Sequence, residues 1–136
     1  MAETRPQICV LEDDAAVRDS LRWMLERNGF SPRIFSSPNE FLLSPGFDRY
    51  DCLVIDLGLP GMSGLELLEL LRARGDATPA VLIAAAASPQ LEPRSRKAGA
   101  SEVLLKPFAP RALLESLEKA IGAGSAEAAT YVTGPK

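Results

Sequence analysis

The chain has 136 residues, of which 46% are hydrophobic, so it can build one well-buried core and is too short for two ordinary domains. Its formal net charge is −3, from 18 acidic and 15 basic residues, and this balance gives no field that would draw the chain onto nucleic acid or anionic lipid. We therefore expect a single domain that does not bind nucleic acid directly.

Cysteine usage and the lengths of the apolar runs indicate the compartment. Cys9 and Cys52 both lie within apolar runs, and the chain has no histidine, so neither a disulfide framework nor a zinc site is expected. No apolar run approaches the ~20 residues needed to span a bilayer, and the opening MAETRPQ lacks the basic-then-apolar order of a signal peptide. We expect a reduced, cytoplasmic protein without membrane contact.

Five segments have the composition of β-strands. Four are short, continuous apolar runs, the pattern of strands buried on both faces of a parallel sheet: Ile8–Leu11, Cys52–Ile55, Ala80–Ala84 and Val103–Leu105. The fifth, Ser31–Phe35, follows Asn28-Gly29 and is less apolar, so we expect a more exposed strand there.

Apolar residues at helical spacing lie between these strands: Val17, Leu21, Met24 and Leu25; Phe41 and Leu42; Leu65, Leu68 and Leu71; and Ala112, Leu113, Leu117 and Ile121. A further short helix is predicted at roughly Pro93–Ala98, since proline is tolerated in a first helical turn. The alternation of strands and helices predicts a doubly wound α/β domain, with right-handed crossovers and helices on both faces of a parallel sheet.

Two segments break this regularity. Ala84–Pro93 contains two prolines and a run of alanines but no aliphatic stripe, so we expect a mobile loop. Residues 122–136 are small and polar without periodicity, and we assign them to a flexible tail or linker that follows a domain of residues 1–121. A helical extension across Ser125–Ala129 is the alternative, since alanine and glutamate favour helix.

Charged residues follow three of the predicted strands. Glu12, Asp13 and Asp14 follow the first strand, Asp56 closes the third, and Lys106 closes the fifth. Ligands of open α/β sheets gather at the carboxyl ends of the strands, so these side chains should meet at one edge. Three carboxylates raise one another's pKa unless a cation is present, and oxygen donors without histidine or cysteine favour Mg²⁺.

Asp56 is the best candidate for a nucleophile that attacks phosphorus, with the metal and the Lys106 ammonium offsetting charge on the phosphoryl oxygens. It ends a buried strand and precedes Gly58 and Gly61, which leave backbone groups accessible to a ligand. Each residue also has an ordinary alternative: the acidic run could cap the first helix, Asp56 could belong to a turn, and Lys106 could be solvated. Their joint occurrence at three strand ends indicates a phosphoryl-transfer site far more specifically than any one of these residues does.

The acidic pair after the first strand, the segment DLGLPGMSGLELL that begins with Asp56 and the segment LKPF that contains Lys106 resemble the receiver domains of bacterial two-component response regulators. The resemblance covers about residues 7–121. It implies a three-layer, flavodoxin-like (βα)5 fold with five parallel strands in the order 2-1-3-4-5. It also implies a signalling protein that catalyses only its own phosphorylation and dephosphorylation.

The same resemblance implies a role for each residue of the acidic edge. Asp56 corresponds to the phosphoacceptor, Asp13 to a direct ligand of Mg²⁺, Glu12 to a second acidic residue acting partly through water, and Gly58 to a backbone-carbonyl ligand. Lys106 would pair with the phosphoryl group, and the Lys106–Pro107 bond is a candidate for the cis isomer. The phosphoryl group would come from a histidine kinase or a phosphotransfer protein.

Two positions depart from the family pattern. Where family members carry Thr or Ser at the end of the fourth strand, this chain has Ala84, and where they carry Tyr or Phe in the fifth strand, it has Val103. The missing hydroxyl would bind a phosphoryl oxygen, and its loss should weaken the coupling of phosphate to the active conformation by ~1.5 to 3 kcal/mol. We therefore expect altered switching, unless Ser88 or a backbone amide supplies the donor.

The resemblance further implies an output domain or partner protein, and a homodimer through the surface of the fourth helix, fifth strand and fifth helix. The KPF segment resembles receivers attached to helix-turn-helix DNA-binding outputs, by analogy alone. A phosphorylation-independent interaction module is the main alternative, favoured by Ala84 and Val103 and opposed by the complete acidic edge. A phosphohydrolase would need a second acid where Gly58 stands, and a flavin site would need a phosphate-binding loop after the first strand.

Overall fold

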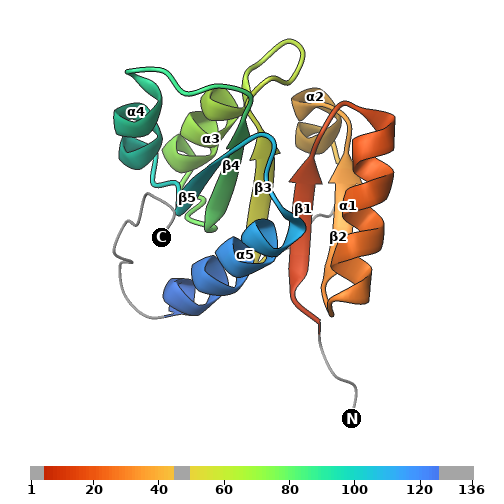
Figure 1. Cartoon of the computed structure of the whole chain (residues 1–136). Coiled ribbons are helices and arrows are strands. Elements are labelled where there is room, and N and C mark those ends of the chain that lie inside the picture. The colour runs from red at the N-terminus through yellow and green to blue at the C-terminus, as the bar shows by residue number, and fades with distance from the viewer. Residues whose placement is uncertain (1–4, 45–49, 126–136) are drawn as a thin grey trace.

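The computed structural model describes residues 5–44 and 50–125, and strands alternate with helices along the chain (Figure 1). The elements are β1 (Gln7–Leu11), α1 (Ala15–Arg27), β2 (Ser31–Phe35), α2 (Pro38–Leu42), β3 (Cys52–Asp56), α3 (Gly64–Ala73), β4 (Ala80–Ala84), α4 (Leu91–Lys97), β5 (Glu102–Leu105) and α5 (Pro110–Ser125). All five predicted strands are confirmed, each within one residue of its expected bounds.

The five strands form one parallel sheet in the order β2-β1-β3-β4-β5, which confirms the expected topology. Helices α1 and α5 cover one face of the sheet, and α2 and α3 cover the other (Figure 1). This arrangement gives three layers with two separate hydrophobic cores. Within the described residues, no helix has the length and the apolar character that crossing a bilayer requires.

Each central strand contributes side chains to both cores, because successive residues of a strand point to opposite faces. Ile8 and Val10 of β1 pack under α1 and α5, whereas Cys9 and Leu11 pack under α2 and α3. All four are at most 1% exposed. Burial on both faces explains why these strands appear in the sequence as continuous apolar runs.

Polar side chains determine where the helices begin. Asp14 caps α1, since its Oδ1 accepts a hydrogen bond from the backbone amide of Val17 at 3.1 Å. Ser63 caps α3 in a reciprocal box with Glu66, in which each side chain accepts from the other residue's backbone amide. The chain leaves α1 through Gly29, whose φ of 90° lies in the left-handed region that glycine tolerates.

Helix α4 is present as expected, but its predicted bounds of roughly Pro93–Ala98 are wrong by two residues at the start and one at the end. Pro93 is the third residue of the helix and so still belongs to the first turn, where a missing N–H costs no intrahelical hydrogen bond. Gln90 precedes the helix and makes no side-chain cap. No pattern in the sequence therefore marked the first residue of α4.

Helix α4 is attached to α3 mainly through polar groups. Arg94 donates from Nε and Nη2 to the two carboxylate oxygens of Glu69, both at 2.9 Å. Arg72 donates from Nε to the carbonyl of Ala98 at 2.9 Å, just beyond the end of α4. The buried residue of α4 is Ser95, which is 0% exposed. Its hydroxyl has no hydrogen-bond partner among the residues that the structure describes. No residue of α4 belongs to either hydrophobic core as described.

Helix α5 continues to Ser125, four residues into the segment predicted as a tail. It is joined to β5 by Glu102, whose carboxylate accepts from the Ser116 hydroxyl and from Lys119 Nζ. The remainder of the tail and of its alternative helix lies outside the described residues, so the domain boundary stays a prediction. The Ala84–Pro93 segment joins β4 to α4 without regular structure over residues 85–90.

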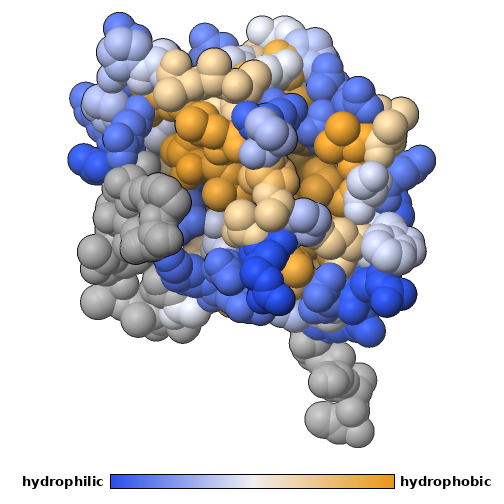
Figure 2. Space-filling view, in the orientation of Figure 1, coloured by the Kyte–Doolittle hydropathy of each residue, from blue (hydrophilic) through white to orange (hydrophobic). Residues whose placement is uncertain are grey.

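The surface seen in the orientation of Figure 1 carries apolar side chains in its middle and hydrophilic ones around them (Figure 2). Among the described large hydrophobic residues, Trp23 on α1 is 63% exposed and Leu105 at the end of β5 is 45% exposed. Trp23 is partly covered by the Arg27 guanidinium, which lies 4.7 Å from the centre of its ring.

Gly64 permits the close approach of α3 to the end of β3. A Cβ atom at this position would lie 2.5 Å from the backbone oxygen of Asp56 and 2.6 Å from Cγ2 of Ile55. Both distances are far shorter than a van der Waals contact, so a side chain here would displace the strand end that carries Asp56. The absence of a side chain at Gly64 is therefore a requirement of the site as well as of the packing.

We predict that Gly64→Ala lowers the free energy of unfolding by about 1–3 kcal/mol, because overpacking outweighs the gain in helix propensity. Gly122→Ala is the matched control, since a Cβ there meets no atom within 4 Å. This control should leave stability unchanged or raise it by up to about 1 kcal/mol. Urea unfolding measures both, and equal stability of the two variants would contradict the packing argument.

Candidate functional site

The acidic residues meet because β1 and β3 are neighbours in the sheet. Leu11 pairs with Ile55, so Glu12 and Asp13 leave β1 beside the point where Asp56 ends β3. One carboxylate oxygen from each of Glu12, Asp13 and Asp56 can be chosen such that all three lie within 4.8 Å of one another. The expectation that the acidic side chains gather at one edge of the sheet is confirmed for Glu12, Asp13 and Asp56, whereas Asp14 lies outside this cluster.

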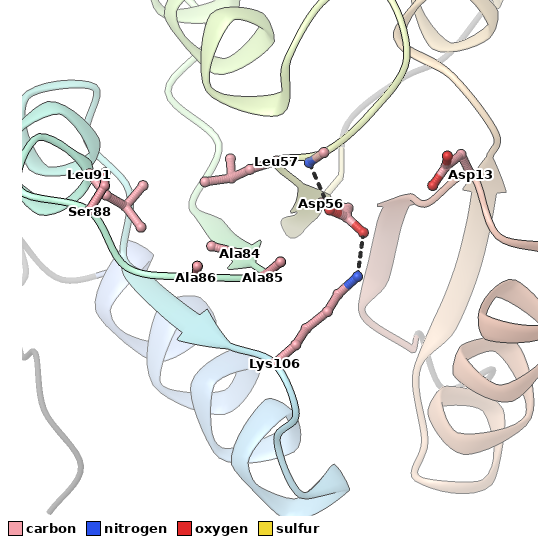
Figure 3. A pocket seen from close by; sticks show the side chains of 10 residues that line it. Asp13, Asp56, Leu57, Ala84, Ala85, Ala86, Ser88, Leu91 and Lys106 are labelled. Carbon is pink, nitrogen blue, oxygen red and sulfur yellow. Dashed lines mark hydrogen bonds and ion pairs between the residues drawn. The ribbon is translucent and has the colours of Figure 1, made fainter.

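Asp56 is held between two hydrogen-bond donors. Its Oδ1 accepts from the backbone amide of Gly58 at 2.8 Å, and its Oδ2 accepts from Lys106 Nζ at 2.9 Å (Figure 3). The side chain of Asp56 is 8% exposed, and that of Lys106 is 39% exposed. A nearly buried carboxylate therefore faces an ammonium group that can still reach solvent.

Two opposing effects act on the charge of Asp56. Burial on its own would raise its pKa, but hydrogen bonds from Gly58 and Lys106 to the carboxylate outweigh burial, and the pKa lies below its usual value. The hydrogen bond to Asp56 in turn raises the pKa of Lys106. Asp56 is accordingly an anion paired with a cation across the ends of β3 and β5.

Glu12 is the more deeply buried partner, at 2% exposure. Burial and a hydrogen bond shared with Asp56 raise the pKa of Glu12 to about 7. Its Oε2 also accepts from the backbone amide of Asp14 at 3.2 Å, which fixes the carboxyl group over the loop that follows β1. Because Glu12 is the carboxyl group that takes up a proton, Asp56 can remain ionised beside it.

The donor set suits a hard divalent cation. Asp13 is exposed, and it and Lys106 lie on different sides of Asp56 (Figure 3). Carboxylate oxygens without nitrogen or sulfur donors are the ligands that Mg²⁺ takes, usually with several waters retained. A cation beside Glu12, Asp13 and Asp56 would favour the ionised form of Glu12, whose pKa is raised by burial and by the hydrogen bond with Asp56.

A pocket of about 420 Å³ opens beside Asp56. Its polar side carries Asp13, Asp56 and Lys106, and its other walls include Leu57, Gly58, Ala84, Ala85, Ala86, Ser88 and Leu91. Leu91 is the first residue of α4, so the pocket reaches from the acidic edge to that helix. This contact of α4 with the pocket was not anticipated from the sequence.

The two positions that depart from the family pattern lie where the resemblance implied. Ala84 ends β4 in the pocket wall at 3% exposure, and its carbonyl accepts from the amide of Lys106 at 2.9 Å. Val103 is partly buried against the core beneath α2 and α3. Ser88, the proposed substitute hydroxyl, lies toward α4 and away from Asp56 (Figure 3). At the position where family members carry a hydroxyl, this chain therefore has only the methyl group of Ala84.

The remaining local predictions have mixed outcomes. The Lys106–Pro107 peptide bond is cis, as the resemblance implied. Capping of the first helix, the alternative role for the acidic run, applies to Asp14 alone. Gly58 contributes its amide to Asp56, while its predicted role as a carbonyl ligand stays a prediction.

Sequence analysis missed Arg18. This side chain donates from Nη1 to the carbonyls of Glu12 and Asp13, at 3.1 and 2.9 Å. Its position four residues after Asp14, one helical turn into α1, indicated that Arg18 lies near the acidic loop. A contact between a side chain and a carbonyl has no sequence signature of its own, however, so the position did not identify the contact.

Chemically, the arrangement offers an ionised carboxylate as a nucleophile, an ammonium group beside it, and an oxygen cluster for a divalent cation. Transfer of a phosphoryl group to a carboxylate needs these three elements, because charge on the phosphoryl oxygens must be offset while the nucleophile stays available. The pocket beside Asp56 leaves room for the phosphoryl group.

A family model and two curated relatives match most of this chain. The family model "Response regulator receiver domain" matches residues 8–118. The chain is 35% identical to the transcriptional regulatory protein FixJ of Bradyrhizobium diazoefficiens over 87% of this chain and 58% of that protein. It is 37% identical to the response regulator MprA of Mycolicibacterium vanbaalenii over 92% of this chain and 57% of that protein.

The solved structure of a CheY-like response regulator receiver domain protein from Methanospirillum hungatei JF-1 superposes with a TM-score of 0.82, at 28% identity over 90% of this chain and 98% of the other. The chain spans little more than half the length of the two curated relatives. On the match to the family model and the identities to these relatives, the chain belongs to the response regulator receiver family.

Proposed function

We propose that this chain is a phosphorylation-dependent receiver that accepts a phosphoryl group on Asp56 from a histidine kinase or a phosphotransfer protein. The observation that supports this most is the placement of the Asp56 carboxylate between the Gly58 amide and the Lys106 ammonium, beside two further carboxyl groups. The receiver would regulate an output domain or a partner protein, and the name of FixJ, a transcriptional regulatory protein, supports transcription regulation as the output.

In the proposed transfer, a carboxylate oxygen of Asp56 bonds to phosphorus while the phosphorus–nitrogen bond of the donor phosphohistidine breaks and the imidazole takes a proton. Lys106 Nζ, 2.9 Å from Oδ2, lies within reach of a phosphoryl oxygen attached there. Mg²⁺, held by Glu12, Asp13, Asp56 and the Gly58 carbonyl, would offset the remaining phosphoryl charge. Attack of water on phosphorus of the acyl phosphate releases inorganic phosphate and returns the Asp56 carboxylate.

The same proposal includes a cytoplasmic location and a homodimer. Cys9 and Cys52 are buried free thiols on opposite faces of the sheet, and burial raises the pKa of both, which suits a reducing cytoplasm. A homodimer through α4, β5 and α5 is supported by the exposure of Leu105 on the edge strand β5.

A phosphorylation-independent interaction module remains the second candidate, because Ala84 offers no hydroxyl to a phosphoryl group. Among the other described side chains of the pocket wall, Ala85 and Ala86 also carry no hydroxyl, and Ser88 lies toward α4. A backbone amide as the substitute donor stays a prediction. We propose that Asp56 is phosphorylated in this protein and that the modification is weakly coupled to movement of α4.

The first prediction concerns the modification itself. With Mg²⁺ and acetyl phosphate, mass spectrometry should find one phosphoryl group on Asp56, and Asp56→Asn should abolish it, because an amide is a poor nucleophile. Asp19→Asn is the control, an exposed aspartate on α1 outside the acidic cluster. An unmodified wild-type protein, or modification that persists in Asp56→Asn, would contradict the proposal.

The second prediction separates the two adjacent acids, Asp13 and Asp14. Mg²⁺ at about 100 times its Kd should raise the free energy of unfolding of the wild-type protein by about 2.7 kcal/mol. Asp13→Ala should lose most of this gain. Asp14→Ala should keep the gain on a baseline lowered by about 0.5–2 kcal/mol, since Asp14 caps α1 and lies outside the three-carboxylate cluster.

Thermal or urea unfolding with and without Mg²⁺ measures this pair of variants, and EDTA should reverse the gain. If Asp13→Ala and Asp14→Ala lost the gain equally, the acidic run would act as diffuse charge and the assigned ligand set would be wrong.

The third prediction concerns the coupling between phosphorylation of Asp56 and the response of α4. Ala84→Thr should strengthen the response of α4 to phosphorylation by about tenfold, because a charge-assisted hydrogen bond contributes ~1.5 to 3 kcal/mol. Ala84→Val is the matched control, with nearly the same shape and no hydroxyl. Hydrogen exchange over residues 91–97, with and without phosphoryl group, measures the response. An equal response in the Thr and Val variants would show that the hydroxyl is not the missing element.

A further inference from the structure

Arg18 binds the backbone of the loop that carries the acidic residues. From the first turn of α1 its Nη1 donates to the carbonyl of Asp13 at 2.9 Å and to that of Glu12 at 3.1 Å. One guanidinium nitrogen therefore bridges two successive peptide groups between β1 and α1. These are the peptides that set the direction of the Glu12 and Asp13 side chains.

The three residues of this loop are held in different ways. The amide of Glu12 donates to the carbonyl of Phe35 at 3.1 Å, and its side chain is buried. Asp14 is fixed as the cap of α1. The side chain of Asp13, in contrast, is exposed to solvent, and its carbonyl is bound by Arg18. Arg18 thus restrains the residue of the cluster whose own side chain is least restrained by packing.

The charge of Arg18 and its contacts with the loop should affect cation binding in opposite directions. A positive charge beside Glu12 and Asp13 repels a divalent cation, so on charge alone the removal of Arg18 should tighten binding. Orientation of the loop acts in the other direction, because ligands already held in position lose less conformational freedom when the cation binds. The sign of the effect therefore distinguishes the two roles.

We propose that Arg18 is a positioning residue for divalent-cation binding, acting through the carbonyls of Glu12 and Asp13. This inference rests on the proposed function, since it takes the acidic cluster as the cation site. Arg18 contacts neither the cation nor the phosphoryl group in this scheme. It lowers the number of conformations that the Asp13 carboxylate can adopt before the cation arrives.

Calorimetric titration with Mg²⁺ measures whether replacing Arg18 weakens or tightens cation binding. Arg18→Met, which keeps much of the side-chain length and loses the charge and the donors, should bind Mg²⁺ about fivefold more weakly than the wild type. Arg18→Lys keeps the charge and one donor group and should restore part of the affinity. Arg22→Met removes the same charge from the next turn of α1 and should leave affinity equal or slightly tighter. Unchanged or tighter binding in Arg18→Met would overturn the proposal.

Hydrogen exchange of the Mg²⁺-free protein supplies a readout that does not depend on the cation. The amide of Asp14, which donates to Glu12 Oε2, should exchange faster in Arg18→Met while amides of β3 keep their protection. Unchanged exchange at Asp14 would also overturn the proposal. If the wild type bound no Mg²⁺ but Asp14 exchange rose as expected, the proposed cation site would fail and the ordering of the loop by Arg18 would stand.

Discussion

The gathering of three carboxyl groups at the edge of a parallel sheet is the constraint on which the rest of the site depends. Neighbouring strands β1 and β3 both end there, so Glu12 and Asp56 share one small volume. Two features reduce the repulsion: the raised pKa of Glu12, which favours its neutral form, and the hydrogen bonds that Gly58 and Lys106 donate to Asp56. Arg18 holds the same loop through the carbonyls of Glu12 and Asp13. A bound cation would favour the ionised form of Glu12 and leave the other contacts in place.

The proposed phosphoryl chemistry and its proposed coupling to α4 depend on different residues. Asp13, Asp56 and Lys106 line the polar side of the pocket, and Ala84, Ala85 and Ala86 form part of its remaining wall. Under the proposed function, these alanine side chains would offer no hydrogen bond to a phosphoryl group on Asp56. The pocket nevertheless reaches Leu91 at the start of α4, which leaves a steric route from the site to that helix.

Much of the fold could be predicted because the strands carry a strong local signal: a strand buried on both faces must be apolar throughout. The strand ends then located Asp56 and Lys106. The start of α4 could not be predicted, since Gln90 supplies no cap, and Arg18 could not, since its acceptors are backbone carbonyls that every sequence possesses. The strand order came from family resemblance, because apolar runs do not specify their neighbours.

Because α4 is attached mainly through polar groups, the free energy of releasing this helix is largely independent of the free energy of unfolding the domain. Releasing this helix would break the Arg94–Glu69 pair and the Arg72 contact, and it would uncover no residue of α4 that belongs to a hydrophobic core. The surface around α4 can therefore be remodelled by a local opening whose cost depends on ionic strength, while global stability, set by the two cores, stays nearly constant. Substitutions at Glu69 and Arg94 would then change how readily α4 opens and leave the two cores unchanged.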